Sequence, residues 1–248
     1  MDEKRRQLLT GISLAGAGVL LNGCRTGSNT SGGADNRSET APGEVAPVEV
    51  TAAEDLMREH GILRRALLVY RESATRLRQD PALIPPDTLE KAANLVRVFG
   101  EDYHEKKIEE VFVFPIVKKA PGAPALYVDV LLRQHERGRE ITDYILSLTR
   151  EDRIPSNSVE PLARALESFV RMYEHHAAIE DTVIFPVWKT AIGESELESL
   201  AAKFEEIETE DFGGDGFDTA LKRMEEIETS LGLSNLEMFT APEPPTAR

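Results

Sequence analysis

Histidine and glutamate side chains interrupt apolar helical stripes at positions where burial is expected. The clearest stripe steps by three and four residues through 162–187, and His176 and Glu180 lie in its middle. These two residues are four apart, so they share one helical face and can reach the same metal centre. His60 and His135 interrupt two earlier stripes in the same way. Because a buried polar group costs about 1–3 kcal/mol unless it is paired, one shared object that satisfies all of them is expected.

The sequence also repeats itself around these residues. The segment YHEKKIEEVFVFP (Tyr103–Pro115) aligns without gaps on EHHAAIEDTVIFP (Glu174–Pro186), with a histidine, a glutamate and the final Phe-Pro identical. His60 and His135 correspond as well, since an arginine stands two residues before each. The chain therefore contains two related helix pairs, each with a histidine on its first helix and one motif on its second.

The spacing in the first motif leaves two alternatives open. His104 and Glu109 are five residues apart, about 140° round an ideal helix, whereas Glu105 and Glu109 are four apart. We expect either a bulge of the π type near His104, which would bring the five-residue pair onto one face, or Glu105 as the partner of Glu109. In the second motif His175 lies about 100° away from His176. We expect His175 to be a second-shell or a surface residue.

Mixed imidazole and carboxylate ligands that project inward from four helices suit iron or manganese. Two ions are expected rather than one, because carboxylates can bridge. Zinc is less suitable, since it normally takes about four ligands and this sequence offers more.

Beyond residue 50 the periodicity is helical throughout, which predicts an all-α protein. Prolines and glycines separate four long helices, and helices of this length with short loops predict an antiparallel four-helix bundle of two hairpins over 51–192. The four helices are expected at about Ala52–Gln79, Asp87–Lys119, Pro124–Thr149 and Val159–Ile192.

The remaining residues, 193–248, predict a short acidic extension. Two amphipathic helices are expected to pack across the bundle, followed by a proline-rich tail. An acidic docking surface is the alternative for this extension. The whole chain carries a net charge of -15, which argues against a nucleic-acid partner, and its one cysteine excludes a cysteine-rich metal site. No protein partner is identified by the sequence.

The first 24 residues have the character of an export signal. Arg5 and Arg6 precede a short apolar run, as in twin-arginine signals, and LNGC ends at Cys24, as in the lipobox of bacterial lipoproteins. We expect Cys24 to be lipidated and residues 25–50 to be a flexible tether. The domain would then be exported and anchored to a membrane on its extracytoplasmic side. An uncleaved N-terminal anchor is the alternative.

Over about 51–189 the chain resembles the hemerythrin-like, or HHE cation-binding, domains. The resemblance rests on Glu59-His60, the HEKKIEE-to-FP stretch, Gln134-His135 and the HAAIED-to-FP stretch. It implies a four-helix bundle with a non-haem di-iron centre that binds, senses or reacts with oxygen, nitric oxide or peroxide. The ligands that it implies are His60, His104, Glu105, Glu109, His135, His176 and Glu180.

One departure from the oxygen carriers of this family bears on function. Those proteins have histidine four residues before glutamate in both motifs, whereas Glu105 takes that place before Glu109 here. An extra anionic ligand would favour ferric iron, which argues against reversible oxygen carriage. Besides simple binding, the expectations are an enzyme that reduces peroxide or nitric oxide or repairs iron centres, and a metal-loaded sensor or docking module without turnover.

Overall fold

The computed structural model describes residues 50–151 and 153–245, and within these ranges every regular element is a helix. The expected signal, tether and lipidated Cys24 lie outside the described residues. Residues Thr51–Arg248 form one compact unit, so the helices after residue 192 belong to the same body as those before it. No helix of the described ranges has both the length and the apolar character needed to cross a membrane.

Helix α2 (Ala52–Gln79) opens the fold and agrees with the expected limits. Thr51 caps it: the Thr51 hydroxyl accepts from the backbone N–H of Glu54, and the Glu54 carboxylate accepts from that of Thr51. The helix stops at Asp80, whose side chain caps the short turn η2 (Pro81–Leu83).

The second long segment is not a plain α-helix. It begins as α3 (Pro86–Leu95), widens into the π-helix η3 (Val96–Val113), and returns to α-helical geometry in α4 (Phe114–Val117). After a turn, α5 (Ala123–Thr149) forms the third segment.

The fourth segment shows the same change of geometry on a smaller scale. The turn η4 (Ser156–Ser158) leads into α6 (Val159–Ile179), then the π-helical turn η5 (Glu180–Ile184) and α7 (Phe185–Ile192). Both π-helical stretches end at the Phe-Pro of their motif. The repeated motifs therefore carry a repeated change in backbone geometry.

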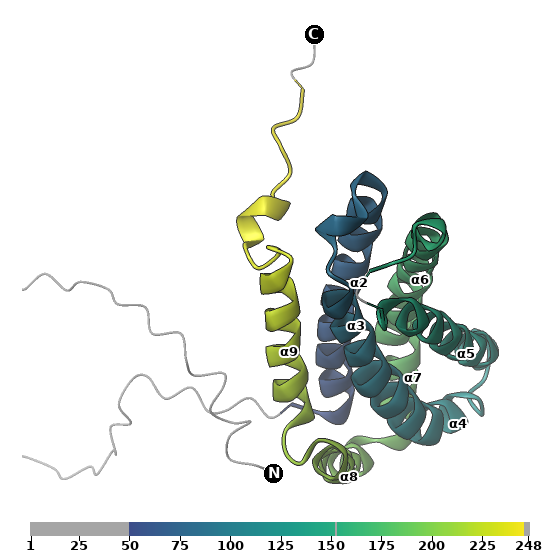
Figure 1. The fold of residues 1–248 in the computed structure, drawn as a ribbon. Helices are drawn as coiled ribbons and strands as arrows, with labels where there is room; N and C mark the ends of the chain where they lie inside the picture. The colour runs from purple at the N-terminus through teal and green to yellow at the C-terminus, as the bar shows by residue number, and fades with distance from the viewer. Residues whose placement is uncertain (1–49, 152, 246–248) are drawn as a thin grey trace, which may run out of the picture. The chain divides into compact units, whose positions relative to one another are not determined.

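Two further helices complete the unit, α8 (Glu194–Phe212) and α9 (Gly216–Ser230), followed by the turn η6 (Leu236–Phe239). Gly213 ends α8 with φ 71°, a left-handed conformation that favours glycine. In Figure 1, α9 lies beside α2 and α3, and α8 crosses the end of the bundle near α7.

Apolar side chains fill the space between α2 and α6 and between α3 and α5. The Tyr70 ring meets the Phe169 ring edge-on with centroids 5.3 Å apart. Trp188 is fully buried, and its indole N–H donates to the backbone oxygen of Phe112 at 3.0 Å. This apolar core holds the polar side chains of the motifs in place.

Candidate metal centre

Four imidazoles meet in two pairs inside the bundle. His60 Nε2 lies 3.1 Å from His104 Nε2, and His135 Nε2 lies 3.1 Å from His176 Nε2. All four side chains are buried. One pair comes from α2 and η3, the other from α5 and α6, so each half of the repeat supplies one pair.

Glu109, on η3, faces both pairs. Its Oε1 lies 3.4 Å from His104 Nε2, and its Oε2 lies 3.5 Å from His135 Nε2. One carboxylate therefore directs one oxygen toward each histidine pair, which is the geometry of a bridging ligand.

Glu180, at the start of η5, repeats this arrangement from the other side. Its Oε2 lies 3.5 Å from His60 Nε2, and its Oε1 lies 3.0 Å from His176 Nε2. Both oxygens of Glu180 and both of Glu109 are buried and take part in no hydrogen bond among the described residues. Buried carboxylates without donors are costly, and cations between them and the imidazoles would compensate.

The outward nitrogens of two histidines are bound by residues that directly follow the two glutamates. His60 Nδ1 donates to Asp181 Oδ1 at 2.7 Å, and His135 Nδ1 donates to Glu110 Oε1 at 2.9 Å. With the proton on Nδ1, the Nε2 lone pair points inward, as a metal ligand requires.

The other two histidines are bound by residues that directly precede a histidine. His104 Nδ1 donates to Glu59 Oε2 at 2.6 Å, and His176 Nδ1 donates to Gln134 Oε1 at 2.9 Å. The four residues that bind the Nδ1 atoms are therefore related between the two repeats in the same way as the candidate ligands. Gln134 is the one neutral partner of the four, so the two halves differ in charge.

Acidic neighbours dominate the electrostatics of the imidazoles. Burial opposes a charged ring, but the carboxylates of Asp181 and Glu180 outweigh it and raise the pKa of His60. Burial is likewise outweighed at His135, where Glu105 and Glu110 raise the pKa to about 9. Without metal, such rings hold protons that a bound cation would displace.

The π-helix η3 explains how residues five apart reach one site. It contains both His104 and Glu109 and brings Nε2 and Oε1 to 3.4 Å. Of the two alternatives for this motif, the backbone bulge near His104 is therefore confirmed. Such wide turns cluster at functional sites.

Glu105 lies beside this group but faces different partners. Its Oε1 accepts from the Tyr173 hydroxyl at 2.5 Å, and its Oε2 accepts from Arg139 Nη1 at 3.2 Å. It approaches His135 on the Nδ1 side, at 3.8 Å, away from the inward Nε2.

His175 is exposed on α6. Of the two expectations for this residue, the structure agrees with the surface position, and the second-shell assignment is corrected.

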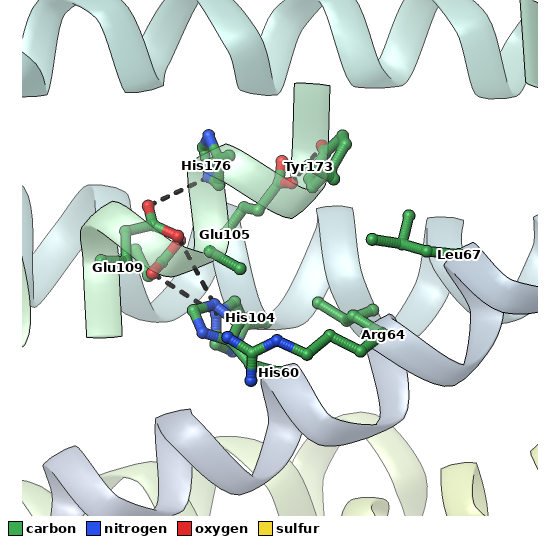
Figure 2. Close-up of a pocket in the computed structure, with 11 residues that line it drawn as sticks. His60, Arg64, Leu67, His104, Glu105, Glu109, Tyr173 and His176 are labelled. Atoms are coloured by element: carbon green, nitrogen blue, oxygen red, sulfur yellow. Dashed lines mark hydrogen bonds and ion pairs between the residues drawn. The ribbon is translucent and has the colours of Figure 1, made fainter. Parts of the chain in front are cut away.

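A cavity of about 10 Å³ adjoins the histidines and glutamates, roughly the space that one water occupies. Figure 2 shows its wall, in which Leu67 and Tyr173 accompany the imidazoles and Arg64 extends from α2 toward His60. The space suits a molecule of two or three atoms.

Sequence reasoning missed the four outer partners, Glu59, Glu110, Gln134 and Asp181. A signal for them was present, because each directly precedes or follows a candidate ligand at matching places of the two repeats. The repeat was used to find ligands but not the groups that hold them.

The donor set fits two metal ions. Around each histidine pair, two inward imidazole nitrogens meet one oxygen of Glu109 and one of Glu180. Among the described residues, none of these carboxylate oxygens takes part in a hydrogen bond, so two nitrogens and two oxygens are available to each ion. Glu105 and Glu110 lie close enough to His135 to form another possible metal-binding group. The Arg139 guanidinium pairs with both of these carboxylates, so a side-chain cation already occupies the position between them.

Comparison with known proteins points the same way. Residues 51–188 match the family model of the hemerythrin HHE cation binding domain, and an overlapping second match covers residues 126–231. An uncharacterized protein of Mycobacterium bovis and uncharacterized proteins of two Mycobacterium tuberculosis strains are each 40% identical to this chain. These similarities extend over 237 residues, 95% of this chain and 90% of each relative. No solved structure matches the chain.

Proposed function

This chain belongs to the hemerythrin HHE cation-binding family, and on that premise we propose that it holds two iron ions between its histidine pairs. His60 and His104 would hold one ion, and His135 and His176 would hold the other. Glu109 and Glu180 would each contribute to both. We propose that the four long segments that carry these residues form an antiparallel four-helix bundle.

One observation carries this proposal: both glutamates have buried carboxylate oxygens without a donor, each oxygen turned toward a different histidine pair. Hydrogen-bonded core histidines alone would not require two such carboxylates. The mixed nitrogen and oxygen donors suit iron or manganese better than zinc, and membership of the hemerythrin HHE family favours iron over manganese.

The bound ions supply an exchangeable coordination position and electrons, and the protein supplies binding and orientation. Asp181, Glu59, Glu110 and Gln134 keep the imidazoles in the tautomer that points Nε2 inward. The adjoining cavity admits only a small molecule such as oxygen, nitric oxide or peroxide. We therefore propose that this protein binds, senses or reacts with a small oxidant.

The metal content of the purified chain tests this proposal. Elemental analysis should find about two irons per chain. His176→Ala should lose iron, whereas His175→Ala, a change of the exposed neighbour on the same helix, should keep it. A folded wild-type chain that takes up no added Fe²⁺, or equal iron in both variants, would overturn the proposal.

We further propose that the protein is exported and held at a membrane by a lipid on Cys24. The support is the sequence alone: the twin arginines, the apolar run and LNGC before a Gly- and Ser-rich segment.

A further inference from the structure

A buried carboxylate stands at the edge of the cavity without belonging to the six proposed ligands. Glu105 is 2% exposed and lines the cavity together with Tyr173, Leu63, Leu67 and Ala177. Apart from the proposed ligands, the wall is otherwise apolar except for Arg64. Apart from the proposed ligands, Glu105 is therefore the buried charged residue that a small molecule in the cavity would contact.

Two other helices hold this carboxylate in place. Tyr173, on α6, donates its hydroxyl to Oε1 at 2.5 Å, and Arg139, on α5, donates to Oε2 at 3.2 Å. Figure 2 shows the carboxylate of Glu105 meeting the ring end of Tyr173. The Tyr173 ring is itself fixed, since it stacks on Phe169 with centroids 4.3 Å apart.

A glycine provides the room that Tyr173 needs. A Cβ atom on Gly138 would lie 2.2 Å from the Tyr173 hydroxyl oxygen, closer than any real contact. Glycine inside a helix costs about 0.5–1 kcal/mol relative to alanine. At Gly138 this cost is offset by the space that the glycine leaves for the Tyr173 hydroxyl.

The charge of Glu105 is only partly compensated. Arg139 serves two carboxylates at once, because it also donates to Glu110 Oε1 at 3.1 Å. Arg64, the other cation near the cavity, is paired with Asp181 and is 44% exposed, so solvent screens it. One guanidinium between two carboxylates leaves the Glu105, Glu110 and Arg139 group with a net negative charge.

We propose that Glu105, fixed by Tyr173, is a specificity-determining residue that makes the cavity favour neutral small molecules over anions. Glu105 does not ligate the metals; it is held beside them, and its negative charge repels an anion that enters the cavity. This inference rests on the proposed function, because it concerns small molecules that bind next to the two metals.

Azide and nitric oxide are suitable probes, since one is an anion and the other is neutral. Their dissociation constants are measured by optical titration of the iron-loaded full chain, azide with the ferric form and nitric oxide with the ferrous form. Glu105→Gln keeps the shape of the side chain and removes its charge. Glu101→Gln is the matched control, because Glu101 is a buried carboxylate one turn earlier on η3 and does not line the cavity. The titrations are made at about pH 8.5, above the pKa of about 7 that burial gives Glu101, so that both substitutions remove a charge.

In Glu105→Gln, azide affinity should rise at least about tenfold, because a charge removed within a few ångströms of an anion in a buried site changes binding by that order. Nitric oxide affinity should change less than about threefold, and iron content should stay at the wild-type value. Glu101→Gln should leave both affinities unchanged.

Two results would overturn the inference while leaving the proposed function intact. Loss of iron from Glu105→Gln would make Glu105 a ligand, and unchanged azide affinity with full iron would remove its influence on the cavity. A wild-type chain without iron would instead overturn the proposed function, and this inference with it.

Tyr173→Phe tests the fixing of Glu105 separately. Without the hydroxyl, Glu105 keeps only its contact with Arg139 and could turn toward the metals, where it would compete with a bound small molecule. Both azide and nitric oxide should then bind at least about tenfold more weakly. Adding Glu105→Gln to Tyr173→Phe should restore nitric oxide binding. Wild-type affinities in Tyr173→Phe would show that Tyr173 does not hold Glu105 away.

Discussion

At the scale of single residues, a buried acid outside the centre makes stability depend on pH. Glu101 is fully buried; its Oε1 accepts from the Thr142 hydroxyl at 2.6 Å, and Arg97 lies 2.9 Å from its Oε2. Burial is the largest influence and raises the pKa of Glu101 to about 7, although the Thr142 hydrogen bond acts against it. The folded protein therefore holds a proton that the unfolded chain releases at lower pH.

The sign of the effect follows from that difference. Between the ordinary pKa of 4.5 and about 7 the folded state binds more protons, so stability falls as pH rises through this window. Glu101→Gln stays neutral and should escape this loss. We expect the variant and the wild type to be similar near pH 5, and the variant to be more stable by about 2 kcal/mol at pH 8.

Urea unfolding at a series of pH values measures this difference. Glu136→Gln, a change of an exposed glutamate on α5, should leave the pH dependence of the wild type unaltered. A wild type and a Glu101→Gln variant with parallel pH profiles would contradict the assignment to Glu101.

Residue types and spacing were sufficient to predict which side chains gather at the centre. His60, His135, His176 and Glu180 followed from polar residues in apolar stripes, and the structure brings them together. The position of Glu105 was not predictable in this way. It depends on Tyr173 and Arg139, which come from two other helices and lie far away in the sequence.

At the scale of elements, α5 and α6 pack closely because one position lacks a side chain. Gly138→Ala would place a methyl group 2.2 Å from the Tyr173 hydroxyl and force the ring to move. Overpacking of this kind costs about 1–3 kcal/mol, more than alanine returns through helix propensity. We expect Gly138→Ala to lower the free energy of unfolding by about 1–2 kcal/mol.

Gly61 provides the matched comparison for this prediction. It also stands inside a helix, α2, but a Cβ there would meet nothing within 4 Å. Gly61→Ala should therefore raise the free energy of unfolding by about 0.5–1 kcal/mol, measured by the same denaturant titration. Equal effects of the two substitutions would show that Tyr173 does not limit the space at residue 138.

The limits of most helices were predictable from local signals. The breaks at Pro81, Pro155 and Gly193 end elements as expected. The first helix also begins at Ala52 as expected, and the structure adds that Thr51 caps it. The change to π-helical geometry in η3 was anticipated only as an alternative, from the five-residue spacing of one pair. The π-helical turn η5 could not be anticipated from residue spacing, because His176 and Glu180 are four apart and already meet across an ordinary α-helical turn.

At the scale of the whole molecule, the acidic C-terminal stretch is part of the fold. Helix α9 buries Ala220, Met224 and Ile227, and Arg65 of α2 binds both carboxylate oxygens of Glu228. The apolar spacing predicted two packed helices, and both are present. Their place in one compact unit with the bundle depends on side chains of α2 and α3, which the spacing within α9 does not reveal.

The location of the molecule is a separate prediction that concerns the N-terminal segment. Cys24→Ser removes the thiol to which a lipid would be attached. If a lipid on Cys24 is the anchor, the variant should lose membrane association, while its iron content should stay unchanged. Fractionation of cells that make the full chain, followed by blotting of the membrane and soluble fractions, measures this.

An Arg5→Lys, Arg6→Lys double variant is the companion experiment for export. If the twin arginines are read as an export signal, the double variant should remain inside the cell. Membrane association of Cys24→Ser equal to that of the wild type would rule out the lipid anchor.

The hydrogen bond from His60 to Asp181 joins residues 121 positions apart, and it has a consequence for how the protein is made. A ribosome releases α2 and η3, with one histidine pair and Glu109, long before it reaches Glu180 and Asp181. During that interval His60 has no outer partner, and its pair lacks one of two carboxylates. A growing chain therefore offers an ion only a partial set of donors, and the full set exists only after residues 180 and 181 have been made.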